Sequence, residues 1–261
     1  MSKSPAYVPA HGLLKGKSVL ITAAAGAGIG FATARRCLEE GARALVLADI
    51  HEGRLGAAAN SLRAEFPSCK LDARLANVTV EREVQELVDH AEVWTDGVDV
   101  LINNAGLGGS KQVVEMTDEE WLRVIDVSLN GTFRMMRAML KKMLPRKRGV
   151  IVNNASVLGW RAQKEQAHYA AAKAGVMALT RCAALEAAEA GVRINAVAPS
   201  IALHDHLKKT APEALLKELA GREAFGRAAE TWEIANVIVF LASDYSSYLT
   251  GEVISASSQR A

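Results

Sequence analysis

Short runs of β-branched and aliphatic residues alternate with longer amphipathic segments along this 261-residue chain, and that alternation limits the fold more than any other feature. Parallel strands need long crossover connections, usually helices, so a repeated strand–helix order favours βαβ units. The pattern therefore predicts one doubly wound α/β domain. We expect strands near 19–22, 44–49, 70–78, 98–103, 149–153, 192–197 and 252–255, and helices near 29–40, 52–66, 80–94, 118–143 and around Tyr169.

Gly26-Ala27-Gly28-Ile29-Gly30 lies between the first expected strand and the first expected helix. Glycines permit a tight turn and a close approach of backbone to a diphosphate, and a helix N-terminus supplies N–H groups and the positive end of a dipole. A strand before and a helix after are the context that a dinucleotide site requires. This turn is therefore predicted to hold the diphosphate of a dinucleotide.

Asp49 closes the second expected strand. A carboxylate at this position can accept hydrogen bonds from both hydroxyls of an adenosine ribose and would repel a 2′-phosphate. We therefore predict NAD as the cofactor in preference to NADP, with an ordinary turn residue as the alternative role of Asp49. Arg35 and Arg36 lie further along the helix, where we expect them to be solvated.

Tyr169 and Lys173 lie at i and i+4 of one expected helix, and Ser156 follows the fifth expected strand. Side chains at this spacing share a helix face, so the ammonium can reach toward the phenol. A nearby cation favours the phenolate and draws its pKa down from about 10 toward the range of a general base. A serine hydroxyl at a strand end can hold a substrate oxygen. A proton-transfer site is the prediction, with a solvated Tyr–Lys pair as the alternative.

The chain is nearly neutral, with 31 basic and 29 acidic residues, so its charge predicts neither nucleic-acid nor membrane binding. The one basic run, at 141–148, is expected to be a solvated connection. Three scattered cysteines lack metal or disulfide spacing, and no segment could cross a bilayer, so we expect a cytoplasmic protein. His204 and His206 have no obvious third ligand, and we expect no metal.

Two more motifs accompany these residues: Asn103-Asn104-Ala105-Gly106 after the fourth strand and Asn195-Ala196-Val197-Ala198-Pro199 in the sixth. In this order the motifs resemble the short-chain dehydrogenase/reductase family from Lys17 to Gly251. The resemblance implies a single-domain Rossmann fold, with a seven-stranded parallel sheet and helices on both faces. Residues 1–16 would be an N-terminal extension and 17–261 the dinucleotide-binding catalytic domain, with a small, helical substrate lobe near 200–227.

The resemblance also implies roles for particular residues. Tyr169 would be the acid/base, Ser156 would orient the reacting oxygen, and Lys173 would hold the nicotinamide ribose. Ser128 stands where the family has an asparagine that helps to hold a relay water, so a catalytic role is carried to Ser128 and not to Asn130. Further cofactor contacts would come from strand ends, namely Asn77, Val78, Asn104, Ala105, Gly106, Pro199 and Ile201.

Three segments, 22–26, 153–163 and 199–202, resemble one bacterial branch of the family. That branch acts on the secondary alcohol of a bicyclic acyl-CoA thioester left from steroid C and D rings. The resemblance predicts an NAD-dependent oxidoreductase that interconverts a secondary alcohol and a ketone on a bulky alicyclic acyl-CoA. Apolar residues on strand-end loops would suit a flat substrate, namely Leu107, Val157, Leu158, Trp160 and Ile201.

Other assignments stay open at this point. Trp160 could instead be a packed loop anchor. Arg161, Lys164, Lys208 and Lys209 are near enough in sequence to contact CoA phosphates, although a solvated position is the alternative that we favour for any one of them.

Two other functions remain as alternatives. A 3-oxoacyl-thioester reductase of fatty-acid type usually prefers NADPH, and no basic residue directly follows Asp49 to support that preference. A non-catalytic dinucleotide-binding regulator would not need the Ser156, Tyr169 and Lys173 set. The family usually forms tetramers by pairing two long helices, here near 118–143 and 162–189, so we expect a homo-dimer or homo-tetramer.

Overall fold

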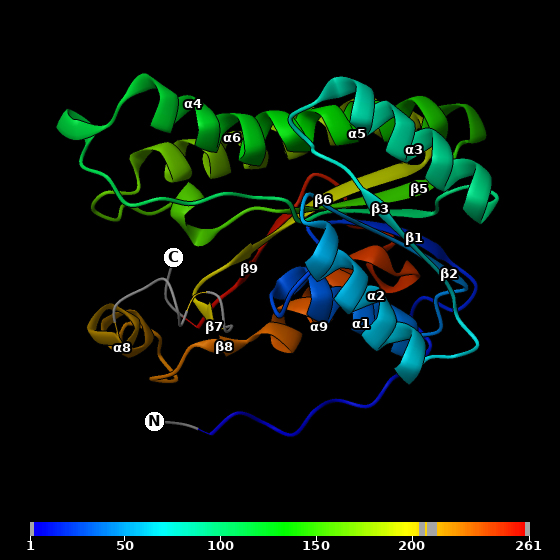
Figure 1. Cartoon of the computed structure of the whole chain (residues 1–261), viewed down its shortest axis with the longest axis horizontal. Coiled ribbons are helices and arrows are strands. Elements are labelled where there is room, and N and C mark those ends of the chain that lie inside the picture. The colour runs from blue at the N-terminus through cyan, green and yellow to red at the C-terminus, as the bar shows by residue number, and fades with distance from the viewer. Residues whose placement is uncertain (1–2, 204–206, 208–212, 259–261) are drawn as a thin grey trace.

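A seven-stranded parallel sheet runs through the centre of the protein (Figure 1). The structure, a computed structural model, describes residues 3–203, 207 and 213–258. Neighbouring strands follow the order β3-β2-β1-β4-β5-β6-β9, and every pair is parallel. The strands are β1 (Ser18–Thr22), β2 (Ala44–Asp49), β3 (Lys70–Leu75), β4 (Val100–Asn103), β5 (Gly149–Asn154), β6 (Val192–Pro199) and β9 (Val253–Ala256).

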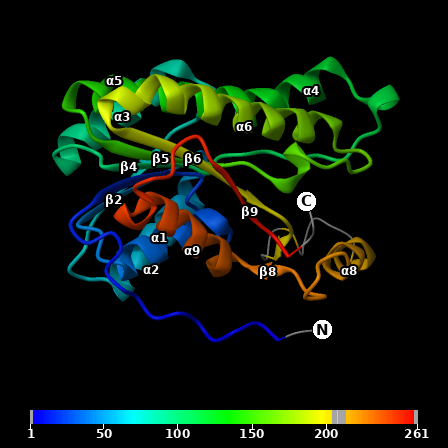
Figure 2. The ribbon, with the colours of Figure 1, turned by 180° about the vertical axis from the view of Figure 1, so that it is seen from behind.

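Helices cover both faces of this sheet, as Figures 1 and 2 show from opposite sides. One face carries α3 (Glu81–Thr95), α4 (Asp118–Ile125), α5 (Gly131–Arg146) and α6 (Ala167–Ala187). The other carries α1 (Ile29–Glu39), α2 (Glu52–Glu65) and α9 (Thr231–Ala242). The predicted Rossmann fold is confirmed. Because all strands are parallel, their carboxyl ends meet at one edge of the sheet, where ligands of such folds bind.

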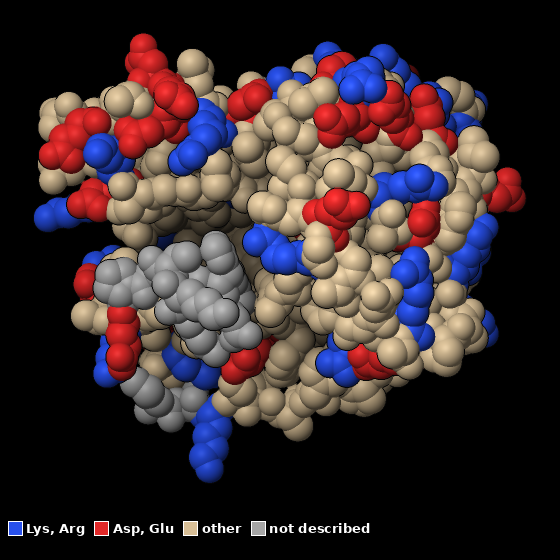
Figure 3. All heavy atoms as spheres, viewed as in Figure 1, with Lys and Arg blue, Asp and Glu red and all other residues tan. Residues whose placement is uncertain are grey.

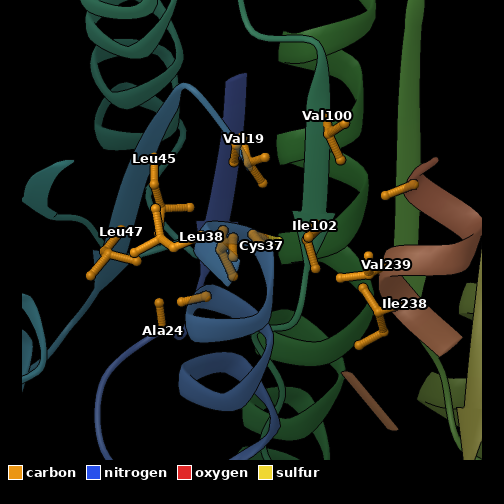
Figure 4. Packing of buried hydrophobic residues seen from close by; sticks show 14 of the residues in the cluster. Val19, Ala24, Cys37, Leu38, Leu45, Leu47, Val100, Ile102, Ile238 and Val239 are labelled. Atoms are coloured by element: carbon orange, nitrogen blue, oxygen red, sulfur yellow. The ribbon is translucent and has the colours of Figure 1, made fainter. Parts of the chain in front are cut away.

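The central strands are mostly apolar, with polar residues at their ends, because helices bury both of their faces. Every residue of β1 and β2 is buried. In Figure 4, Val19, Leu45 and Val100 of the sheet lie in one cluster with Leu38 of α1 and Ile238 of α9. Burying one such side chain contributes about 1.5–3 kcal/mol, and this packing holds the strand ends in a fixed arrangement.

The sequence prediction missed α9 and the break in the long helix near 118–143. The α9 segment is apolar almost all round, so it shows little helical periodicity. The long helix begins at the predicted capping box, where Thr117 Oγ1 accepts a hydrogen bond from Glu120 N at 3.2 Å. It then passes through a π-helical turn, Asp126–Asn130, before continuing as α5. Such turns occur often at functional sites.

We expected the lobe near 200–227 to be helical, but it also contains a short strand. It contains α8 (Glu213–Gly221) and begins with β7 (Ala202–Leu203), which pairs in parallel with β8 (Ala229–Glu230). A two-residue strand is too short for the sequence to show alternation, which explains the error. The predicted positions His204, His206, Lys208 and Lys209 lie outside the described residues.

The N-terminal segment before β1 lies along α1 and α9. Arg36, which we expected to be solvated, is 3% exposed and pairs with Glu40 at 2.5 Å. Arg36 also donates to the carbonyl of Val8, and Glu40 accepts from the backbone N–H groups of His11 and Leu13. The expectation that Arg36 is solvated was wrong because the N-terminal segment covers this arginine. The i, i+4 spacing of Arg36 and Glu40 predicts an ion pair but does not show that another segment buries it.

Among the residues that the structure describes, no helix is both long and apolar enough to cross a membrane. The same residues include no group of three or more His, Cys, Asp or Glu side chains placed to hold a metal ion.

Candidate active site

Ser156, Tyr169 and Lys173 come together beside the carboxyl end of β5. Ser156 follows this strand and begins the 3₁₀ turn Val157–Gly159, where its Oγ accepts from Leu158 N at 3.2 Å. Tyr169 and Lys173 lie on the first turns of α6, with Lys173 Nζ 5.6 Å from the centre of the tyrosine ring. The short turn packs directly on α6, since a Cβ on Gly159 would lie 2.5 Å from Met177 Cε.

The pKa shift of Tyr169 has the opposite direction to the one predicted from the sequence. Burial raises the pKa of Tyr169, and a hydrogen bond from Ser156 opposes that rise. Lys173 was expected to lower the pKa of Tyr169, but its ammonium lies over the ring and donates to the carbonyl of Asn154 at 2.6 Å. Burial also lowers the pKa of Lys173, to about 8. At neutral pH the phenol is therefore protonated and has a proton that it could donate.

Ser128 holds the loop that faces this cluster. Its Oγ accepts from Leu107 N at 2.9 Å and donates to Leu107 O at 3.0 Å, and the side chain has no exposed surface. The loop passes close to the cluster, because a Cβ on Gly106 would lie 3.3 Å from Lys173 Nζ. The only hydroxyl proton of Ser128 is engaged, so this geometry favours positioning of the loop over the predicted catalytic contact. Asn130 instead donates to Asp126 Oδ1 at 3.0 Å.

The glycine turn after β1 leaves space for a ligand at the N-terminus of α1. A Cβ added to Gly26 or Gly28 would meet nothing within 4 Å. One on Gly30 would lie 2.2 Å from Ala23 O, so that glycine is needed for packing within the turn. The first turn of α1 has no acidic residue to repel a phosphate. Open glycines at an uncapped helix N-terminus suit the diphosphate of a dinucleotide.

Asp49 lies beside this turn at the end of β2. Its carboxylate is 8% exposed and accepts from Ala25 N at 3.1 Å and His51 N at 3.0 Å. Burial raises the pKa of Asp49, although Ala25 and Arg54 oppose the rise. Each carboxylate oxygen has a further lone pair, so the group can still accept from ribose hydroxyls.

The other predicted cofactor residues lie at the same edge of the sheet. Asn104 N and Ala105 N both donate to Thr22 Oγ1, at 3.0 and 3.1 Å. Asn77 Oδ1 accepts from Thr79 N at 3.0 Å. The rest follow strand ends or support them, namely Val78 against Gly131, Gly106 after β4, Pro199 at the end of β6, and Ile201, whose carbonyl accepts from Ala229 N.

The surface is hollowed at the carboxyl-end edge of the sheet (Figure 3). Trp160 follows the turn after Ser156 and is 48% exposed, so it is not a packed loop anchor. Leu107, Leu158 and Ile201 are partly buried. Val157, which we expected to face a substrate, is buried, with 6% of its surface exposed.

Sequence reasoning missed Asn154, whose carbonyl holds Lys173 and whose side chain donates to Asn104 Oδ1 at 2.8 Å. A signal was present in the paired amides Asn153-Asn154, since two adjacent polar residues are unusual at the end of a buried strand.

The fold and this site define a class of protein. A Rossmann sheet with a glycine turn after its first strand, beside a Ser, Tyr and Lys cluster, is the arrangement of a nicotinamide-dependent oxidoreductase. A family model described as enoyl-(acyl carrier protein) reductase matches residues 23–258. The chain belongs to the short-chain dehydrogenase/reductase family and is an oxidoreductase of that family.

Individual relatives are similar over almost the full length. The (5R,7aS)-5-hydroxy-7a-methyl-1-oxo-2,3,5,6,7,7a-hexahydro-1H-indene-carboxyl-CoA reductase of Mycobacterium tuberculosis is 59% identical over 99% of this chain and 98% of its own. A 3-oxoacyl-[acyl-carrier-protein] reductase of Thermotoga maritima is 38% identical over 92% and 96%. The crystal structure of a short-chain dehydrogenase from Mycobacterium smegmatis has a TM-score of 0.88 at 55% identity, covering 99% of both chains.

Proposed function

We propose that this oxidoreductase interconverts a secondary alcohol and a ketone on a bulky alicyclic acyl-CoA in the degradation of steroid rings, with NAD as its dinucleotide. The meeting of Ser156, Tyr169 and Lys173 beside the glycine turn carries the proposal. The relative from Mycobacterium tuberculosis, with its bicyclic CoA-linked substrate, supports this substrate class. The 3-oxoacyl-[acyl-carrier-protein] reductases are the alternative, at lower identity.

Tyr169 moves the proton in this proposal. Because burial keeps the phenol protonated at neutral pH, Tyr169 donates to the oxygen of a ketone during reduction and takes that proton back during alcohol oxidation. Ser156 donates toward the same oxygen and orients it. When bound, the nicotinamide dinucleotide supplies or accepts the hydride. Lys173 holds the end of β5 through Asn154 O and lies within reach of a nicotinamide ribose.

The predicted preference for NAD rests on Asp49. Its carboxylate lies beside the glycine turn and retains acceptor capacity for two ribose hydroxyls. A 2′-phosphate at the same place would meet a negative charge in a partly buried site, which favours NAD over NADP. The ratio of kcat/KM with NADH to kcat/KM with NADPH, measured for reduction of a bicyclic oxo-acyl-CoA, tests this preference.

The substrate would lie against the exposed apolar side chains near the cluster. Trp160 presents a large flat surface next to Ser156, which suits a bicyclic ring system. Arg161 and Lys164 follow Trp160 in the chain and could offer positive charge to CoA phosphates. We assign residues 17–261 to the catalytic domain, with the segment near 200–227 as its small substrate lobe.

A homo-oligomer is part of the same proposal. Leu122 of α4, Phe133 of α5 and Leu185 of α6 are exposed by 59, 41 and 79%. Apolar side chains on these helices suit helix pairing between copies of the chain. Sedimentation at several protein concentrations distinguishes a dimer or tetramer from a monomer.

Turnover by Tyr169→Phe tests the function. We expect reduction of a bicyclic oxo-acyl-CoA, followed by loss of NADH absorbance, to fall by about 10²–10⁴-fold in this variant. Binding of NADH, measured by calorimetry, should stay within a few-fold of the wild type. Full turnover in the variant would refute the assigned chemistry. Faster turnover of a linear 3-oxoacyl thioester than of the bicyclic substrate would favour the fatty-acid-type alternative.

A further inference from the structure

Asn154, the last residue of β5, connects the glycine turn to Lys173 through a continuous row of hydrogen bonds. Its Nδ2 donates to Asn104 Oδ1 at 2.8 Å, and Asn104 Nδ2 donates to the carbonyl of Ala23 at 3.0 Å. In the other direction, the carbonyl of Asn154 accepts from Lys173 Nζ at 2.6 Å. The row therefore joins β1, β4, β5 and α6 directly below the proposed dinucleotide site.

The neighbouring amide, Asn153, belongs to a separate network. Successive side chains of a strand point to opposite faces of the sheet. Asn153 accordingly donates to Thr180 Oγ1 of α6 at 2.9 Å and accepts from Asn103 Nδ2 at 2.9 Å, in the fully buried core. Asn154 contributes nothing to that core network, so the two amides have different tasks.

The contacts fix the orientation of the Asn154 amide. Asn104 Nδ2 is committed to Ala23 O, so Asn104 Oδ1 faces Asn154 and needs a donor. The Nδ2 of Asn154 supplies that donor, which leaves Asn154 Oδ1 buried without a partner among the described residues. A buried acceptor without a partner is costly, whereas an apolar side chain of similar size would avoid that cost. Stability of the strand alone therefore does not explain an asparagine here.

The glycine turn at the far end of the row has little freedom to adjust. Ala23 has a φ of +50°, in the left-handed region, and Gly30 packs against its carbonyl. Lys173 at the near end is 2% exposed and is held by the Asn154 carbonyl. A displacement of either end is thus transmitted through Asn154 to the other.

We propose that Asn154 is a positioning residue that couples the glycine turn to Lys173, so that dinucleotide binding and the placement of the lysine ammonium depend on each other. This coupling rests on the proposed function, because it takes the glycine turn as the diphosphate site. It assigns Asn154 no contact with substrate and no proton transfer.

Asn154→Leu removes the donor and keeps a side chain of similar size. We expect NADH affinity, measured by calorimetry, to fall about tenfold, as for one lost hydrogen bond. Tm should change little, because the orphan acceptor of Asn154 is removed while Asn104 Oδ1 loses its donor. A merely structural role would lower Tm and leave the affinity unchanged. Asn130→Leu, which removes an amide with a 3.0 Å bond to Asp126, is the matched control and should leave NADH affinity within twofold.

Asn154→Asp gives a second measurement with an isosteric side chain. Its carboxylate has no N–H to donate to Asn104 Oδ1, so NADH affinity should fall as it does in Asn154→Leu. An affinity within twofold of the wild type in either variant would overturn the coupling. Both readouts are independent of turnover, so they are distinct from the Tyr169→Phe test of function.

Discussion

A single methyl group at Gly30 provides a direct test of how the glycine turn is packed. In the structure an added Cβ would lie 2.2 Å from Ala23 O and 2.5 Å from Asn104 Nδ2. These two atoms already form a 3.0 Å hydrogen bond, and the backbone of Ala23 is in the left-handed region. Neither atom can move away without breaking the bond or changing the turn. Gly30→Ala is therefore expected to damage both stability and dinucleotide binding.

The expected size of the effect follows from three contributions. Overpacking costs about 1–3 kcal/mol, and loss of the hydrogen bond adds about 1 kcal/mol. The higher helix propensity of alanine recovers about 1 kcal/mol, because Gly30 lies in the first turn of α1. The net loss in the free energy of unfolding is about 1–3 kcal/mol, which in a domain of this size lowers Tm by roughly 2–12 °C.

Chemical unfolding at a fixed protein concentration, together with NADH calorimetry, measures both consequences of Gly30→Ala. Gly56→Ala in α2 is the matched control, since its added Cβ would meet nothing within 4 Å. The free energy of unfolding of this control should rise by about 0.5–1 kcal/mol, whereas that of Gly30→Ala should fall. If Gly30→Ala is as stable as the wild type and binds NADH equally well, the packing argument for the turn is wrong.

Two further predictions concern buried charges. Arg36→Ala should lower the free energy of unfolding by about 3 kcal/mol, because it leaves the Glu40 carboxylate buried and unpaired. The control Arg35→Ala removes a side chain that is 46% exposed and should change this free energy by only about 0–1 kcal/mol. Equal effects of the two variants in chemical unfolding would contradict the burial of Arg36. Lys173 has a folded pKa of about 8, below its ordinary 10.5, so the unfolded chain binds more protons between these pH values and stability must rise with pH there. Above pH 8 the free energy of unfolding of the wild type should rise, relative to that of Lys173→Met, by up to about 1 kcal/mol per pH unit. If the difference in this free energy between the two proteins stays constant from pH 7 to 10, the pKa of Lys173 is not lowered.

The elements that sequence reasoning predicted well are those whose signals are local. β1 and β2 are continuous apolar runs, and the capping box at Thr117 needs only four residues. Tyr169 and Lys173 share a helix face through spacing alone. The positions of these groups in the chain were therefore sufficient to predict their secondary structure and, by resemblance, the family.

Other features depended on contacts between distant segments. The burial of Arg36 requires the N-terminal segment to lie over α1, and the loop held by Ser128 requires the π-helical turn to face Leu107. The helical signal of α9 was hidden because the helix is surrounded by core on most sides. None of these contacts leaves a periodic signal in the sequence.

The sequence by itself determined most of the order of strands and helices, the glycine turn and the candidate reacting side chains, because period, spacing and residue type are properties of short segments. Only the tertiary structure decided the directions of the pKa shifts of Tyr169 and Lys173, since burial is the largest cause of both. It also decided the connection through Asn154, because parallel strands far apart in the chain end at one edge of the sheet.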